Sequence, residues 1–513
     1  MGTHQENNKR IAKNTIVLYV RMIFVLLVAL YTSRVLLDVL GVEDYGVYNV
    51  VGGVVTMLGF FNGAMVSSTQ RFFSFAIGQE DVEQLNRNYS TILLIQGGLA
   101  LLVILLAETV GLWFVRTYLV IPPERMSAAL WVYHFAVFSF VLSMLQVPFT
   151  ALIITHERMN VYALISIGDV ALKLLLVLIL PYLPFDKLIS YAVLLFCVAL
   201  ITCSAYVLYC KVRLRYVRVI KRFDRNLFRV LLSYMGWNLW GNSAAVIMGQ
   251  GINILLNIFF GPAVNAARAI AYQVQGALNQ LVANFQLALN PPIVKSYARG
   301  EMDYMHRLII SGSKLSFALI FSISLPIILE TETLLSVWLK SVPEHAVLFT
   351  KLTMIFAITE SISGPLMCAV QSTGRIALYQ TVVGGMLILN LPVSYVVLKL
   401  GGSPEATVVV SIIISLVAFI FRVFIVSPRI SISRWRLLKE VFLKSSVVSA
   451  VVAAVCLFAF HFIGTGIASF MVLLLISMAG TALSMYFLAL DDRERHLVAG
   501  KVSRFFIDLS HER

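Results

Sequence analysis

The sequence predicts an all-α polytopic membrane protein with fourteen transmembrane helices: two six-helix bundles followed by two further helices. Three observations predict this fold. Hydrophobic residues make up 59% of the 513 residues and charged residues only 13%, whereas soluble domains carry about 25% charged residues. Apolar runs of roughly 20 residues, each long enough to cross a bilayer core, recur throughout the chain. Segments of the first half also reappear in the second half.

The apolar runs define the predicted elements in order. Backbone polar groups in lipid must be satisfied within the spanning structure, and the runs lack the alternating pattern of barrel strands. Each run is therefore expected to be a helix. The predicted spans are 14–37, 46–67, 89–113, 127–154, 161–182, 188–210, 229–259, 262–290, 308–329, 347–371, 376–398, 405–426, 445–463 and 467–489.

The distribution of basic residues predicts the orientation. An even number of spans places both termini on one side, and most of the 40 Lys and Arg residues fall in the termini and loops of that side. The positive-inside rule makes that side cytoplasmic. The net charge of +14 therefore needs no nucleic-acid partner. The densest basic stretch, 211–229, suits anionic lipid headgroups or, alternatively, an anionic substrate.

Three pairs of similar segments indicate an internal duplication. Their members lie about 220 residues apart and at equivalent places between the predicted helices: "FAIGQED" (75–81) with "YARGEMD" (297–303), "PFTALIITHERMNVY" (148–162) with "PLMCAVQSTGRIALY" (365–379), and "LLDVLG" (36–41) with "LLNIFFG" (255–261). Copies of six helices insert with the same orientation, so the repeat is parallel. Two such bundles with a site between them is a layout for alternating access.

The duplication divides the chain into three predicted segments. Residues 1–214 form a first lobe of six helices, 215–430 form a second lobe of six helices, and 431–513 hold the last two helices and a cytoplasmic tail.

Over essentially its whole length the chain resembles the multidrug/oligosaccharidyl-lipid/polysaccharide (MOP) exporter superfamily, and within it the Wzx-type polysaccharide flippases. The resemblance is carried by the opening "NTIVLYVRMIFVLLVALYTSRVLLDVLGVEDYGVYNVV", by "FAIGQED" after the second span, and by the plan of six, six and two helices. It implies a MATE-like fold and transfer of undecaprenyl-diphosphate-linked oligosaccharide to the outer leaflet of a bacterial inner membrane. Such transfer feeds O-antigen (lipopolysaccharide), capsule or exopolysaccharide synthesis, with a polysaccharide polymerase and glycosyltransferases as further partners. We expect a monomer.

Basic residues inside the spans are candidate substrate contacts. A charge in lipid costs roughly 2.5–3.5 kcal/mol on insertion scales, so these residues should face protein, water or an interface. They are Arg21, Arg34, Lys173, Arg268 and Lys314. Each has a structural alternative. Arg21 and Lys314 could reach the membrane interface, Arg34 could pair with Asp38, and Lys173 could pair with Asp169 four residues earlier.

Polar stripes supply the other candidate contacts. The span 262–290 carries Asn265, Arg268, Tyr272, Gln275 and Asn279 on one face, while Asn49 lies in its repeat partner and Asn238 and Asn242 lie in the span 229–259. Amides donate and accept hydrogen bonds, which suits sugars, and the arginine fork binds oxyanions bidentately. Hydrogen-bonded packing between helices is the alternative interpretation.

Two acids inside the spans are candidates for ion coupling. Glu360 could balance a nearby cation, or it could couple transport to a proton or sodium ion, and Asp169 could serve in the same way.

Other functions find little support in the sequence. A cation-coupled multidrug exporter of the same superfamily is the main alternative, but such transporters generally place a carboxylate in the first or seventh helix, where this chain has none in mid-span. Nucleotide-binding, zinc-protease and hydrolase motifs are absent, as is a long external loop that could hold an active site. We therefore expect a transporter rather than an enzyme, with no catalytic residues, no cofactor and no metal.

Overall fold

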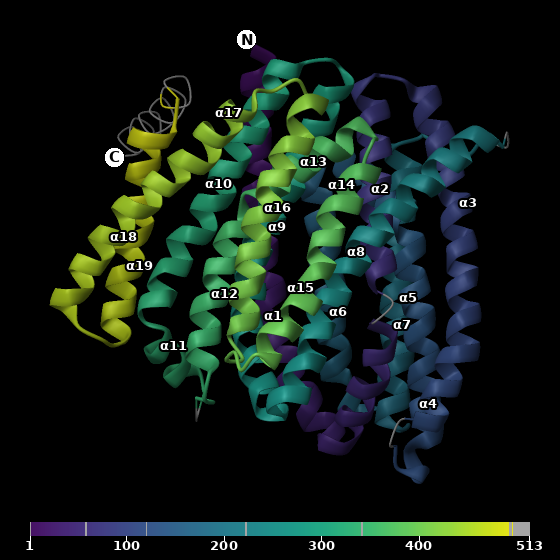
Figure 1. The fold of residues 1–513 in the computed structure, drawn as a ribbon. Coiled ribbons are helices and arrows are strands. Elements are labelled where there is room, and N and C mark those ends of the chain that lie inside the picture. Colours follow the sequence, from purple (N-terminus) through teal and green to yellow (C-terminus); the bar gives the residue numbers. More distant parts are fainter. Residues whose placement is uncertain are drawn as a thin grey trace, which may run out of the picture. The chain divides into compact units, whose positions relative to one another are not determined.

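The computed structural model of the chain describes residues 2–56, 59–118, 121–220, 223–339, 342–491 and 495 (Figure 1). Every regular element within these ranges is helical. The longer helices of the first half are α1 (Gly2–Thr56), α2 (Gly59–Gly78), α3 (Val82–Leu106), α5 (Met126–Thr155), α6 (Met159–Ile179) and α7 (Lys187–Arg213). Shorter pieces extend α3: a π-helix, η1 (Ala107–Gly111), and α4 (Leu112–Tyr118).

The second half is built in the same way. Its longer helices are α8 (Arg225–Phe260), α9 (Pro262–Ala298), α10 (Met302–Leu329), α12 (Ala346–Ser361), α15 (Gly385–Lys399), α16 (Ala406–Arg429), α18 (Lys444–Ile463) and α19 (Ile467–Ser484). The short helices α11 (Thr331–Trp338), α13 (Ser363–Thr373), α14 (Ala377–Tyr379) and α17 (Arg434–Leu437) lie between them. The second half also contains three π-helical segments. The segment η4 (Gln380–Gly384) precedes α15, η5 (Leu438–Leu443) precedes α18, and η6 (Met485–Ala489) follows α19.

Within the described residues, twelve helical segments are long and apolar enough to cross a membrane. The all-helical membrane fold is thus confirmed, but the count of fourteen spans is not. The predicted spans 46–67 and 262–290 are the two without a counterpart. Residues 57–58 of the first lie outside the described residues. The second coincides with α9, which is 37 residues long and falls short in hydropathy because amides and an arginine interrupt its apolar residues.

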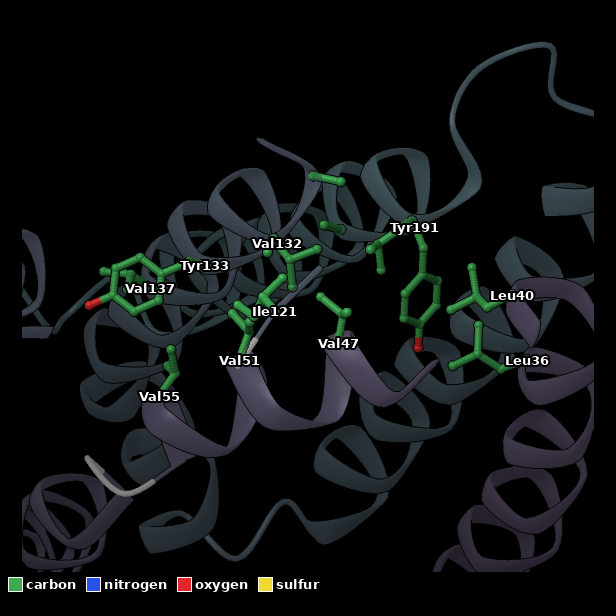
Figure 2. Packing of buried hydrophobic residues seen from close by; sticks show 14 of the residues in the cluster. Leu36, Leu40, Val47, Val51, Val55, Ile121, Val132, Tyr133, Val137 and Tyr191 are labelled. Atoms are coloured by element: carbon green, nitrogen blue, oxygen red, sulfur yellow. The ribbon is translucent and has the colours of Figure 1, made fainter. Parts of the chain in front are cut away.

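Helix α1 consists of two helical segments joined at Gly41. This residue has φ 76° and ψ 170°, a conformation that only glycine adopts without strain. The second segment places Val47, Val51 and Val55 on one face, since residues four apart share a face. Figure 2 shows that this face packs against Val132 and Tyr133 of α5. Between helices in lipid, such contacts stabilise through close packing rather than through removal of apolar surface from water.

The chain divides into two compact units. Unit 1 contains Met1–Val246, Leu287–Met305 and Gln371–Gly384, and unit 2 contains Ile247–Gln286, His306–Val370 and Gly385–Arg513. Unit 1 therefore includes the end of α9 and the segment around α14, both from the second half of the sequence. The lobe boundaries predicted from the repeat remain a prediction.

In unit 1, helix α5 lies at the centre and packs against α1, α2, α3 and α7. One end of this arrangement is held by Arg125, which precedes α5. Its Nε donates to Asp44 Oδ1 over 2.7 Å and its Nη1 donates to Asp186 Oδ2 over 2.6 Å. Asp186 also caps α7 by accepting from the Ile189 N–H at 3.0 Å. The kinked α1, α5 and α7 are thus tied together at this end.

In unit 2, the helices α18 and α19 lie side by side and form a hairpin (Figure 1). Two buried groups attach it to the rest of the unit. The side chain of Lys314 in α10 donates to the Ala489 carbonyl over 2.9 Å. Glu330, which is 1% exposed, accepts from the Gly466 N–H over 3.2 Å. The hairpin is therefore fastened near both ends.

Candidate functional site

A cavity of about 910 Å³ opens inside unit 1. Its walls come from α1, α2, α5, α6 and α7, with Leu287 of α9 at one end. Along α5 the lining runs from Val132 to Ile154, a rise of about 33 Å at 1.5 Å per residue. The cavity therefore extends over a length comparable to the thickness of a bilayer core.

Among the residues that the structure describes, the charged residues that line this cavity are Arg21, Asp169 and Lys173. All three were predicted from their positions inside apolar spans, and the fold brings them together from α1 and α6. The remaining polar lining consists of amides and hydroxyl groups, among them Asn62, Gln70, Gln146, Ser143, Thr202 and Tyr206. These two cations and one carboxylate give the described part of the lining one net positive charge.

Arg21 is held against an aromatic ring of the neighbouring helix. Its guanidinium carbon lies 4.8 Å from the centroid of the Tyr162 ring, within the range of a cation–π contact. Tyr162 also lines the cavity. The contact positions the guanidinium at the wall of the cavity.

Asp169 and Lys173 form the ion pair that their spacing predicted. Lys173 Nζ lies 2.8 Å from Asp169 Oδ2, and the Thr202 hydroxyl of α7 donates to Asp169 Oδ1 over 3.0 Å. The Lys173 side chain is 43% exposed and that of Asp169 is 20% exposed. Lysine has three donors, so Lys173 retains hydrogen-bonding capacity toward the cavity while its charge is balanced.

The amides predicted for the span 229–259 lie in unit 1 but are engaged by protein. Asn238 is 1% exposed; its amide donates to the Ser68 hydroxyl over 2.9 Å and its oxygen accepts from Gln380 over 3.2 Å. Asn242 donates to the Asn238 carbonyl over 3.0 Å. These contacts are those of hydrogen-bonded helix packing. The predicted Arg34 and Asn49 have side chains that lie outside the described part of the chain.

The remaining predicted contacts belong to unit 2, most of them on α9. Arg268 is 4% exposed, stacks 4.1 Å from the Tyr272 ring centroid, and donates to Asn253. Its Nε, Asn265 Oδ1 and Gln275 Oε1 are buried and find no hydrogen-bond partner among the described residues, whereas Asn279 is exposed. The stripe thus carries buried polar atoms with unused hydrogen-bonding capacity.

Lys314 and Glu360 are both engaged within unit 2. Lys314 is 1% exposed and holds the α18–α19 hairpin, so it does not extend to an exposed surface. Glu360 lies 3.2 Å from Arg422 Nη1 and also accepts from the Ser415 hydroxyl. Arg422 was missed because its position near the end of the span 405–426 made it resemble a loop residue.

Sequence reasoning also missed the neutral residues that complete the cavity. Tyr162 lies on α6 and contacts Arg21 of α1, while Thr202 lies on α7 and contacts Asp169 of α6, and only these contacts between helices reveal their roles. A signal did exist for Thr202, because it is a hydrogen-bonding residue in the middle of a predicted span.

No family model and no curated protein matches the sequence. Solved structures do match the fold. An outward-facing multidrug resistance MATE family transporter of the MOP superfamily is 13% identical, with a TM-score of 0.72, over 82% of this chain and 96% of that chain. A MOP superfamily transporter from Pyrococcus furiosus, described by a reversed polarity of its binding pocket, is 13% identical with a TM-score of 0.71 over 82% and 96%.

A further MATE structure, in the bent conformation, is 12% identical with a TM-score of 0.71 over 82% of this chain and 96% of that chain. Similarity at such low identity concerns the fold alone. The chain therefore has the all-helical, multi-pass membrane fold of the MATE transporters of the MOP superfamily.

Proposed function

We propose that the protein is a flippase that carries an undecaprenyl-diphosphate-linked oligosaccharide from the cytoplasmic to the outer leaflet of a bacterial inner membrane by alternating access. The product would serve the synthesis of a cell-surface polysaccharide. The observation that carries this proposal is the long cavity of unit 1, whose lining combines Arg21 and Lys173 with amides and hydroxyl groups.

The chemistry of the lining suits such a headgroup. A diphosphate needs a cation, and Arg21 offers a planar set of donors that binds oxyanions in a bidentate manner. Sugars need neighbouring donors and acceptors, which Gln70, Gln146 and Thr202 supply. The volume of about 910 Å³ lies near the upper end of the range for ligand pockets, which leaves room for more than one sugar ring. Arg268 of unit 2 remains a predicted second contact.

The proposal is tested by leaflet-resolved transport in proteoliposomes that contain a fluorescent lipid-diphosphate-linked oligosaccharide. Arg21→Ala should reduce the initial rate at least tenfold, since one charged hydrogen bond contributes about 1.5–3 kcal/mol. Arg21→Lys should retain an intermediate rate because it keeps the charge but loses the fork. The control Lys399→Ala changes a basic residue outside the cavity and should transport normally. Normal transport by Arg21→Ala would contradict the proposal.

A cation-coupled multidrug exporter is the second candidate, and one observation favours it: the Asp169 carboxylate lies in the cavity wall. In such an exporter, Asp169 would exchange a proton or sodium ion for a cationic drug. Efflux of an organic cation that is driven by an ion gradient and lost in Asp169→Asn would support this function. The net positive charge of the described lining residues disfavours it.

Several attributes follow from the proposed function. Both termini lie in the cytoplasm, the protein acts as a monomer in the bilayer, and enzymes that build and polymerise the oligosaccharide are its functional partners. The protein itself forms and breaks no covalent bond.

A further inference from the structure

The two copies of the repeated phrase meet each other in unit 1. Phe75 and Tyr297 have ring centroids 6.4 Å apart, and Arg299 Nε donates to the Gly78 carbonyl over 3.1 Å. A Cβ atom on Gly78 would lie 2.8 Å from the Ala298 Cβ and 2.8 Å from the Lys295 Cα. This is closer than Cβ atoms approach, so the end of α2 can touch the end of α9 only because residue 78 is glycine.

An ionic cluster surrounds the turn between α5 and α6. Glu157 has φ 59° and its side chain is 3% exposed. It lies 2.6 Å from Lys295 Nζ and 2.7 Å from Arg10 Nε, and its backbone carbonyl accepts from Asn14 over 3.2 Å. The start of α1 and the end of α9 are therefore both attached to this turn.

An apolar layer lies between this cluster and the cavity. It consists of Leu18, Ile154, Met159 and Ala288, which are between 0% and 4% exposed. Ile154 also lines the end of the cavity, as does the adjacent Leu287. Together the apolar layer and the ionic cluster form two layers beside this part of the cavity, at the α5–α6 turn, and we call these two layers the floor.

The segment 365–379, which is the second copy of the repeat 148–162, is also held by a neighbouring helix. Arg71, near the end of α2, donates from Nε to the Gln371 carbonyl over 3.1 Å and from Nη2 to the Ser372 carbonyl over 3.0 Å. Its guanidinium lies 4.8 Å from the Phe75 ring centroid. Thus α2 binds the end of α13, while α9 binds the turn after α5.

We propose that this floor is the cytoplasmic gate of the transport cycle, and that release of Lys295 from Glu157 together with withdrawal of the α9 end is the step that opens the cavity to the cytoplasm. The inference rests on the alternating access of the proposed function, but it does not depend on the identity of the cargo. Charge and shape both matter here: a buried carboxylate that loses its cations is strongly destabilised, and the apolar layer closes only while Gly78 allows the helices to touch.

The test measures access to the cavity from the cytoplasmic side. Ser143→Cys introduces a thiol in the cavity wall. Inside-out vesicles are then treated with a membrane-impermeant maleimide. The parent protein with Ser143 measures the background labelling of the native cysteines. Glu157→Gln and Lys295→Met should each accelerate labelling at least tenfold, while Lys295→Arg should keep it slow. Gly78→Ala should also accelerate labelling, although it changes no charge.

The matched control is Glu83→Gln. Glu83 pairs with Arg87 on the same side of unit 1, but its side chain is 70% exposed, and the variant should label at the parent rate. Thermal unfolding of each purified variant verifies that it is folded. Unchanged labelling in folded Glu157→Gln, Lys295→Met and Gly78→Ala would overturn the gate. Accelerated labelling in a protein that moves no lipid-linked oligosaccharide would retain the gate and reject the proposed cargo.

Discussion

At the scale of single residues, the cavity shows how charge is kept inside an apolar protein. Asp169 is held by a cation and a hydroxyl group, while Arg21 rests on an aromatic ring. The ion pair could be predicted from the spacing of Asp169 and Lys173 within one helix. The Tyr162 and Thr202 contacts could not, because they depend on which helices become neighbours.

His156 gives a prediction at this scale. It lies just beyond α5, where its Nδ1 lies 2.7 Å from the Leu152 carbonyl and its Nε2 meets the Tyr216 hydroxyl. A carbonyl can only accept, so Nδ1 carries the proton and Nε2 accepts from Tyr216. Burial lowers the pKa of His156 to about 4. Between about pH 6.5 and pH 4 the folded protein therefore binds fewer protons than the unfolded chain.

The stabilisation from neutral His156 is complete above pH 6.5 and is lost as the pH falls toward 4, with a total of about 3 kcal/mol. Thermal unfolding in detergent across this pH range should show the loss, and His156→Gln should flatten the profile. A His156→Gln profile as steep as that of the parent would contradict the assignment.

At the scale of elements, α9 combines features that its hydropathy alone does not reveal. Its polar stripe was visible in the sequence, and so was a helix over 262–290. Its extension to Ala298 and its membership of both units were not, because they depend on contacts with α2 and the α5–α6 turn. Pro291 and Pro292 lie inside α9, between the apolar layer and Lys295 of the floor. Each proline removes one hydrogen bond of the helix and weakens it locally.

We expect these two prolines to act as a hinge for the α9 end. Replacing both with alanine restores two helical hydrogen bonds and stiffens the segment, so the transport rate should fall severalfold while thermal stability rises or stays constant. Pro326→Ala, in α10, is the control and should transport normally. Single-turnover flipping in proteoliposomes measures the effect. Undiminished transport by the double variant would show that α9 moves as a rigid rod.

At the scale of the whole molecule, the fold class could be predicted from composition and run length, while the duplication stays a prediction from three short pairs of segments. The count of spans could not be settled, because α9 is polar and residues 57–58 are not described. The contacts of the floor join residues more than one hundred positions apart, such as Glu157 and Lys295. No local pattern encodes such a pairing.

The net charge of the proposed cargo gives a prediction for the molecule as a whole. A membrane potential that is negative inside drives an anionic headgroup outward. It contributes about 2.3 kcal/mol per charge for each 100 mV. Imposing such a potential on proteoliposomes should accelerate outward flipping, and collapsing it with an ionophore should remove the acceleration. A neutral lipid-linked sugar is the control and should not respond. Net transport of the diphosphate cargo that ignores the potential would contradict this source of energy.

The polarity of α9 also has a consequence for biogenesis. A helix that is too hydrophilic to partition into lipid on its own cannot remain there while the ribosome completes the chain. Only Gly261 separates α9 from α8, and α8 is apolar enough to span the membrane. We therefore expect the translocon to release the two as one helical hairpin, so that damage to α8 would leave α9 stranded outside the bilayer.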